Sequence, residues 1–86
     1  MYAIEFLPSA KKELAKLDFV IQKQLKEKIL LLASDPEKLK HNIKALKGEY
    51  SGKFRLRVGN YRVIFRIVKN EVVIIIIRIG HRKEVY

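Results

Sequence analysis

The hydrophobic positions of the chain follow two different periods in its two halves. Tyr2, Ile4 and Phe6 alternate with other residues, which predicts a short first strand. Apolar residues then recur every three or four positions, as they do along one face of a helix. From residue 53 onward the period changes to two, the period of a strand. The pattern therefore predicts a strand, then helices, then further strands.

Two helices are expected between residues 8 and 35. Pro8 suits the first turn of the first helix, which is short. Asp18 is suited to cap a second, longer helix. The apolar stripe of that helix follows steps of four, four and three: Ile21, Leu25, Ile29 and Leu32. Pro36 ends it, because the residue before a proline is steered away from helical backbone angles. A short connection predicts that the two helices form an antiparallel hairpin.

Residues 37–52 carry a weaker pattern. Leu39, Ile43 and Leu46 have the spacing of a turn of helix, and Gly48 marks a break. The segment shows no repeat and no biased composition. We interpret it as a connection between the helices and the strands that follow.

Residues 53–68 predict a β-hairpin with Gly59 and Asn60 in its turn. After a second turn near Asn70, residues 72–79 are apolar at seven of eight positions, which is typical of a strand covered on both faces.

We predict an α+β fold in which the helices pack on one side of a mostly antiparallel sheet, in the order β-α-α-β-β-β. A chain of 86 residues has material for one core, so residues 1–86 are expected to form one domain.

The charge of the chain is unbalanced and unevenly placed. The formal net charge is +10. Residues 1–43 hold 8 basic and 6 acidic side chains, whereas residues 44–86 hold 11 and 3. Such an excess in a small domain predicts a polyanionic partner, either nucleic acid or an acidic protein segment. A solvated basic surface that serves only solubility is the alternative.

Several classes of function are not expected from the composition. The chain has no cysteine, so disulfides and thiolate sites are excluded. It has two histidines and no clustered ligand set, so neither a metal nor another cofactor is expected. Its longest apolar run, residues 72–77, is far shorter than the about 20 residues of a membrane span, and no secretory signal is recognisable. We therefore expect a cytoplasmic protein without a membrane partner.

The predicted hairpin gathers positive charge on one face. With Gly59 and Asn60 in the turn, Arg57 pairs with Arg62, Arg55 with Ile64 and Lys53 with Arg66. The basic side chains of this face are Lys53, Arg55, Arg57, Arg62 and Arg66, and residues 53–66 contain no acidic residue. Like charges facing each other destabilise a sheet, so a compensating anion such as phosphate is expected. A charged face that only discourages aggregation is the alternative.

The segment after the last strand carries further candidates for chemistry. Its residues are His81, Arg82, Lys83, Glu84, Val85 and Tyr86. The end of a strand is a rigid support for ligand-contacting groups, and His, Arg and Tyr supply an acid or base, a phosphate clamp and a stacking ring. Tyr50, Tyr61 and Tyr86 offer faces for unpaired bases. A solvated tail is the alternative.

Three segments carry a resemblance to a known family. They read FLPSAKKEL at residues 6–14, GKFRLRVGNYRVIF at residues 52–65 and GHRKEVY at residues 80–86. The chain resembles the RelE family of toxins from type II toxin–antitoxin modules, within the RelE/ParE superfamily. The closing segment favours the RNA-cleaving RelE branch over the gyrase-poisoning ParE branch.

The resemblance implies a ribosome-dependent endoribonuclease, an mRNA interferase that needs no metal. It would cut mRNA in the ribosomal A site by attack of the RNA's own 2′-hydroxyl group. The catalytic positions implied are Lys53, Arg55, Arg62, Arg82 and Tyr86. Arg62 and Arg82 would stabilise the charge of the transition state, and Lys53 is a candidate general base. Tyr86 would orient or deprotonate the reacting group and stack near the nucleobase. We assign the remaining cations to RNA or phosphate binding: Arg57, Arg66, His81 and Lys83.

One departure from the family concerns proton transfer. Some members carry a lysine where this chain has Arg55, and a guanidinium stabilises charge but is a poor proton donor. Proton transfer would then fall to another group.

The resemblance also implies partners. These are a small acidic antitoxin of the RelB kind, the ribosome with its mRNA, and operator DNA through the antitoxin complex. Two other functions stay open, namely inhibition of DNA gyrase in the manner of ParE and a catalytically weak relic that acts as a corepressor with its antitoxin.

Overall fold

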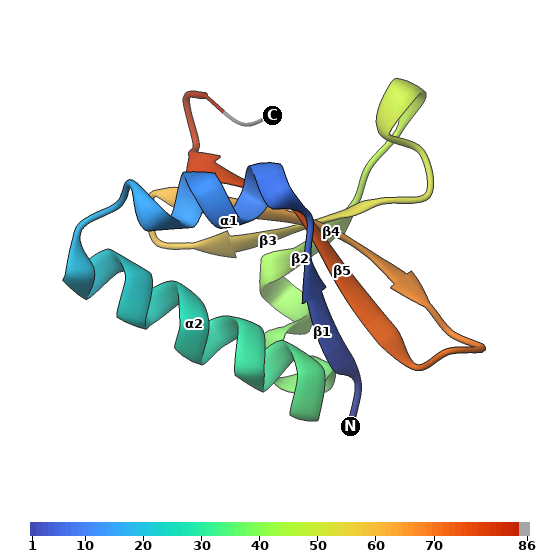
Figure 1. Ribbon diagram of the computed structural model, residues 1–86. Coiled ribbons are helices and arrows are strands. Elements are labelled where there is room, and N and C mark those ends of the chain that lie inside the picture. The colour runs from blue at the N-terminus through green and yellow to red at the C-terminus, as the bar shows by residue number, and fades with distance from the viewer. Residues whose placement is uncertain (85–86) are drawn as a thin grey trace.

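The computed structural model describes residues 1–84. A five-stranded sheet in the order β1-β5-β4-β3-β2 forms one layer, and β1 with β5 is its one parallel pair within the described residues. Two helices form the second layer (Figure 1). The elements in chain order are β1 (Ala3–Phe6), α1 (Pro8–Ala15), α2 (Phe19–Ser34), the 3-10 helix η1 (Pro36–Asn42), β2 (Ile43–Ala45), the 3-10 turn η2 (Gly48–Tyr50), β3 (Phe54–Val58), β4 (Tyr61–Val68) and β5 (Val73–His81). This architecture confirms the α+β prediction.

The two predicted helices are present with the expected boundaries. α1 begins at Pro8, and α2 ends at Ser34, two residues before Pro36. Asp18 occupies the position before α2, but its side chain makes no capping hydrogen bond. The connection is instead held by Gln22, whose Nε2 donates to the carbonyl oxygen of Leu17 at 2.8 Å.

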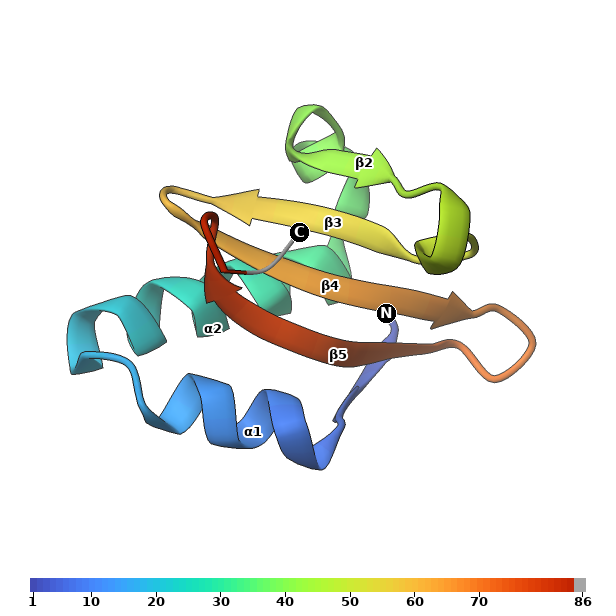
Figure 2. The ribbon, with the colours of Figure 1, turned by 90° about the horizontal axis from the view of Figure 1, so that it is seen from above.

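The core lies between the helices and one face of the sheet. Seen from above, α2 passes beneath the strands and α1 lies alongside β5 (Figure 2). Ala10 and Leu14 of α1 pack into this core, and the rings of Phe54 and Phe65 stack within it at 5.6 Å. Its largest fully buried side chains include Phe65, Leu25, Ile29, Leu32, Leu56, Ile74, Ile76 and Ile79. The helices therefore occupy one face of the sheet.

The segment interpreted as a connection contains a strand that the sequence analysis missed. Residues 43–45 form β2, which pairs antiparallel with β3 and places Ile43 opposite Leu56. Three residues are too few to show a period of two, and β2 exists because β3 offers a free edge for pairing. The prediction of three C-terminal strands is therefore corrected to four.

The outer edge of β5 is covered in two different ways. Its first half pairs with β1, from Ala3 opposite Val73 to Phe6 opposite Ile76. Its second half is covered by side chains of α1. The hydroxyl of Ser9 donates to the carbonyl oxygen of Ile77 at 3.4 Å, and the Ile79 N–H donates to Glu13 Oε1 at 2.9 Å.

Glu13 also pairs with the one charged side chain of β5 that precedes its end. The Arg78 guanidinium donates to Glu13 Oε2 at 2.9 Å. This hydrogen bond and the charge of Glu13 raise the pKa of Arg78, with a smaller contribution from Tyr50 and against an opposing effect of desolvation. One carboxylate thus satisfies both a backbone donor and a guanidinium at the sheet edge.

Replacing Glu13 with alanine is expected to lower the free energy of unfolding by about 2 kcal/mol, because it removes two hydrogen bonds to a carboxylate. Glu13→Gln keeps an acceptor for the Ile79 N–H and should cost less. Chemical denaturation followed by circular dichroism measures both. The control is Glu37→Ala, which removes the exposed Glu37–Lys40 ion pair and should change stability by less than about 0.5 kcal/mol. Equal losses of stability in the two alanine variants would contradict the conclusion that Glu13 stabilises the fold through its hydrogen bonds to β5.

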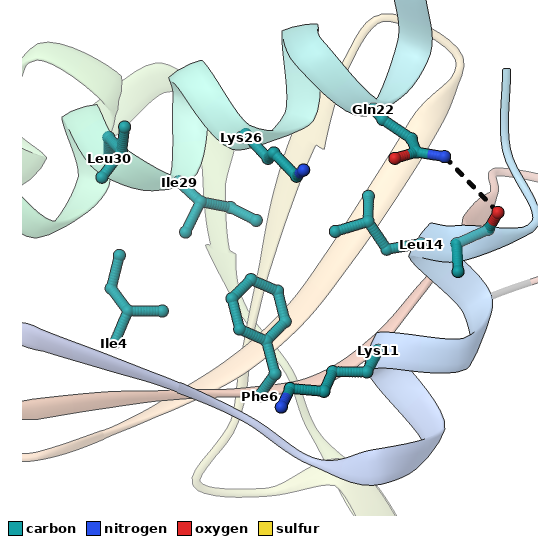
Figure 3. A pocket seen from close by; sticks show the side chains of 9 residues that line it. Ile4, Phe6, Lys11, Leu14, Gln22, Lys26, Ile29 and Leu30 are labelled. Carbon is teal, nitrogen blue, oxygen red and sulfur yellow. Dashed lines mark hydrogen bonds between the residues drawn. The ribbon is translucent and has the colours of Figure 1, made fainter. Parts of the chain in front are cut away.

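A groove of about 570 Å³ opens between β1, α1 and α2 (Figure 3). Its floor is apolar, with Ile4 and Phe6 of β1 and Ile29 of α2, and Lys11 and Lys26 line it from the two helices.

None of the helices formed by residues 1–84 has the length and hydrophobicity needed to cross a membrane.

Candidate functional site

The hairpin between β3 and β4 has the register predicted from its turn. Val58 pairs with Tyr61 and Arg57 pairs with Arg62. Gly59 adopts φ +58°, a backbone conformation that a glycine enters without steric cost. Because β3 begins at Phe54, the predicted pair of Lys53 and Arg66 lies outside the hydrogen-bonded ladder.

Three arginines of this hairpin lie on the face away from the helices. Leu56 and Val63 of the paired strands are fully buried in the core. Side chains alternate between faces along a strand, so the neighbours of those residues point the other way. These neighbours are Arg55, Arg57 and Arg62. The sequence prediction of a basic face is thus confirmed for the hydrogen-bonded part of the hairpin.

Arg62 has more buried nitrogen atoms without a hydrogen-bond partner than the other arginines of this group. Its side chain is half-buried, and its Nε and Nη1 have no hydrogen-bond partner within residues 1–84. Desolvation lowers its pKa first, followed by the positive charges of three other arginines. These are Arg55, Arg57 and Arg82. We call Arg55, Arg57, Arg62 and Arg82 the arginine cluster.

Arg82 joins the cluster from the other end of the chain. β5 ends at His81, and the Arg82 N–H donates to the carbonyl oxygen of Asn60 in the hairpin turn at 2.8 Å. The next turn is closed by the Glu84 N–H, which donates to the His81 carbonyl oxygen at 2.8 Å. Backbone bonds thus fix the exposed Arg82 beside the turn that connects Arg57 to Arg62.

The cluster leaves several of its buried donor nitrogens without hydrogen-bond partners among the described residues. Arg55 Nε, like the two nitrogens of Arg62, lacks a partner among the described residues. Leaving a buried donor unpaired costs about 1–3 kcal/mol, and facing like charges add to that cost. A phosphate group would satisfy these donors and offset the repulsion, since guanidinium groups bind phosphate oxygens in pairs.

Lys53 lies one residue before β3, beside a loop on the same side of the sheet. Its Nζ lies 5.9 Å from the centroid of the Tyr50 ring. The side chain is half-buried, like that of Arg55. The structure thus places Lys53 at the Phe54 end of β3, whereas Arg57 lies near the hairpin turn.

The other predicted binding residues lie apart from the cluster. Arg66 is exposed on the same face, four residues beyond Arg62 along β4, or roughly 13 Å away. The rings of His81 and Tyr61 meet in a T-shaped arrangement with their centroids 5.6 Å apart, and Tyr61 packs against the core on the helix side. Lys83 is exposed in the C-terminal turn, where its N–H donates to His81 Nδ1 at 3.2 Å. Tyr86 lies outside the described residues.

A second cavity of about 370 Å³ lies beside His81 on the helix side of the sheet. Its walls include Glu13, Lys16, Tyr61 and Glu84. Within residues 1–84, no three side chains of the His, Cys, Asp and Glu types gather as a metal site.

Sequence reasoning missed the interaction of Glu13 with Arg78. Arg78 is the single charged residue in the apolar run at residues 72–79, and that exception was the available signal. A charge in a covered strand needs a partner, but the partner comes from α1 at a distance in sequence that no local pattern reveals.

Comparison with known proteins gives concordant results for sequence and fold. Residues 4–86 match the family described as the ParE toxin of type II toxin–antitoxin system, parDE. The chain is 30% identical to the mRNA interferase toxin RelE of Escherichia coli K12 over 87 residues, which covers 99% of this chain and 90% of that protein.

Solved structures of the same kind share the fold. The intact Escherichia coli RelBE toxin–antitoxin complex contains a chain with a TM-score of 0.75 and 29% identity, over 94% of this chain and 96% of that one. The archaeal RelE–RelB complex of Pyrococcus horikoshii OT3 gives a TM-score of 0.77 and 26% identity, over 98% of both chains.

Proposed function

The chain belongs to the RelE/ParE family of toxins of type II toxin–antitoxin systems, and on that premise we propose that it is an mRNA interferase that cleaves mRNA in the ribosomal A site. The observation that carries this proposal is the arginine cluster with three buried nitrogen atoms that lack a hydrogen-bond partner among the described residues. A site that only gave the protein solubility would leave its cations exposed to water. Here the donors of Arg55 and Arg62 are withdrawn from water, which is the arrangement expected for a site that binds an anion tightly.

The proposed chemistry is attack of the RNA 2′-hydroxyl on the adjacent phosphate. The 2′ oxygen gives up its proton and forms a bond to phosphorus while the bond to the 5′ oxygen breaks. The 5′ oxygen takes up a proton from Tyr86 or from water, which leaves a 2′,3′-cyclic phosphate and a free 5′-hydroxyl. Negative charge builds on the phosphate oxygens in the transition state, and preorganised donors stabilise that charge. We assign this role to Arg62 and Arg82, assisted by Arg55.

Proton transfer is assigned to other side chains, because a guanidinium does not release its proton near neutral pH. Lys53 is the proposed base for the 2′-hydroxyl. Tyr86, which lies outside the described residues, is proposed to orient the reacting nucleotide or to take part in proton transfer. Arginine charges supply the electrostatic stabilisation in this scheme, so it includes no metal or other cofactor.

Binding of the rest of the RNA is assigned by position. Arg57 is exposed within the cluster and is proposed to hold the reacting phosphate or its neighbour. Arg66 and Lys83 are exposed at two separate places and are proposed to contact more distant phosphates. His81 packs against Tyr61 on the helix side, so we propose that it supports the C-terminal turn instead of contacting RNA.

We also propose an acidic antitoxin of the RelB kind as the partner, acting in the cytoplasm. Relatives of similar fold have been solved as complexes with RelB antitoxins. Carboxylates that paired with Arg62 and Arg82 would compete with RNA for the same donors, so inhibition would need no conformational switch. Any contact with operator DNA is proposed to occur through this complex.

Primer extension on an mRNA programmed into ribosomes with an empty A site tests the proposed activity. Cleavage within the exposed codon that disappears without ribosomes is the expected result. The match to a family described by ParE favours gyrase inhibition as the second candidate, so a supercoiling assay runs in parallel. Loss of supercoiling with intact mRNA would replace the proposal by gyrase inhibition. Inactivity in both assays would replace it by a corepressor role.

A further inference from the structure

A closed loop precedes β3 at the end of the strand that lies away from the hairpin turn, and it carries Tyr50. Residues 46–53 leave the sheet after β2 and return before β3, where the Leu46 N–H donates to the Lys53 carbonyl oxygen at 3.0 Å. Inside the loop, the Lys53 N–H donates to the Tyr50 carbonyl oxygen, also at 3.0 Å. Gly48 and Gly52 adopt φ +67° and +87°, which permits these tight reversals. The backbone of the loop is therefore fixed at both ends.

The Tyr50 ring is held by packing on the face of the sheet away from the helices. Leu46 and Ile64 form a small buried cluster, and Tyr50 and Ile77 pack against it. The ring is thus supported by the sheet and by its own loop.

We propose that Tyr50 is a positioning residue, whose ring fixes the ammonium group of Lys53 at the Phe54 end of β3, two residues before Arg55 of the arginine cluster. The Nζ of Lys53 lies within the distance at which the face of an aromatic ring attracts a cation. The catalytic meaning of this contact rests on the proposed function, in which Lys53 is the base: the ring holds the ammonium that forms when the Lys53 amine takes the proton of the 2′-hydroxyl.

The chemistry of an aromatic ring suits this position better than that of a carboxylate. A lysine side chain has four rotatable methylene groups, and nearby arginines repel its charge, so an unsupported Lys53 would point away from them. An acidic residue would hold the ammonium but would also compete with phosphate for the cluster. A tyrosine ring holds the cation through its quadrupole and adds no net negative charge.

Nuclear magnetic resonance tests the contact without reference to activity. A ring beneath the end of Lys53 should shift its ε-methylene protons upfield in the wild type. Tyr50→Phe keeps the ring and should keep the shift, whereas Tyr50→Leu keeps apolar packing but should lose the shift. Ordinary Lys53 shifts in the wild type, or an unchanged upfield shift in Tyr50→Leu, would overturn the proposal.

Cleavage on programmed ribosomes tests whether the contact between Tyr50 and Lys53 affects the rate of the proposed reaction. Tyr50→Leu is expected to lower the cleavage rate about two- to fivefold, the size of an exposed cation–π contact, and Tyr50→Phe should act like the wild type. In a Lys53→Ala background, Tyr50→Leu should have no further effect, because its partner is gone. An equal loss in both backgrounds would show that Tyr50 acts through the fold and would overturn the positioning role. If the wild type does not cleave, the proposed function fails, while the resonance measurement still decides the contact.

Discussion

Replacing Arg62 with methionine is expected to abolish most cleavage while making the protein more stable. Arg62 is the proposed centre of charge stabilisation, and removing one preorganised donor from such a site typically lowers a rate by about 10²–10³-fold. Methionine keeps the aliphatic length of the side chain and removes its charge. Single-turnover cleavage on programmed ribosomes measures the loss of activity.

The gain in stability follows from the same geometry. Arg62 has two buried nitrogen atoms without partners among the described residues, and it lies near the charges of Arg55, Arg57 and Arg82. Removing these unfavourable interactions should add about 1 kcal/mol, which raises the melting temperature of a domain this small by about 4–8 °C.

Arg78→Met is the matched control, because Arg78 is the arginine that pairs with Glu13. The same substitution should lower the melting temperature there, since it leaves the Glu13 carboxylate without its guanidinium. If Arg62→Met and Arg78→Met destabilised the protein equally, the arginine cluster would not be a strained anion site.

Replacing Arg82 with alanine is expected to lower cleavage by about 10- to 100-fold without a change in stability. A hydrogen bond to a charged group contributes about 1.5–3 kcal/mol, which corresponds to that range of rates. The Arg82 side chain is exposed, and its backbone bond to Asn60 survives the substitution, so the free energy of unfolding should stay within about 0.5 kcal/mol.

The control for Arg82 is Lys69→Ala, which removes one positive charge from the exposed turn at the far end of β4. Its cleavage rate should match that of the wild type when both are measured at the same salt concentration, because general electrostatic attraction to RNA depends on salt. Equal losses in the two variants would indicate that Arg82 contributes only to net charge.

Much of this site could be predicted because its signals are local. Gly59 and Asn60 fix the turn, and the period of two then fixes which side chains share a face. The structure confirms the resulting pairs, including Arg57 with Arg62. Arg82 was a candidate because it follows the last strand, whereas its place beside the hairpin turn depends on the pairing of β5 with β4.

The parts that could not be predicted depend on contacts between distant segments. β2 has no pattern of its own and is defined by the strand it pairs with. The interaction of Glu13 with Arg78 joins two segments through a side chain. The packing of His81 against Tyr61 depends on the pairing of β4 with β5.

The parallel pairing of β1 with β5 has a consequence for synthesis of the protein. A chain is made from its N-terminus, so β1 emerges first and remains without its partner until β5 has been made. The hairpin of β3 and β4 forms from neighbouring residues much earlier, and it already carries Arg55, Arg57 and Arg62. When β5 pairs with β4, it completes the sheet and also places Arg82 beside the hairpin turn. A chain without β5 therefore lacks both a complete sheet and a complete arginine cluster.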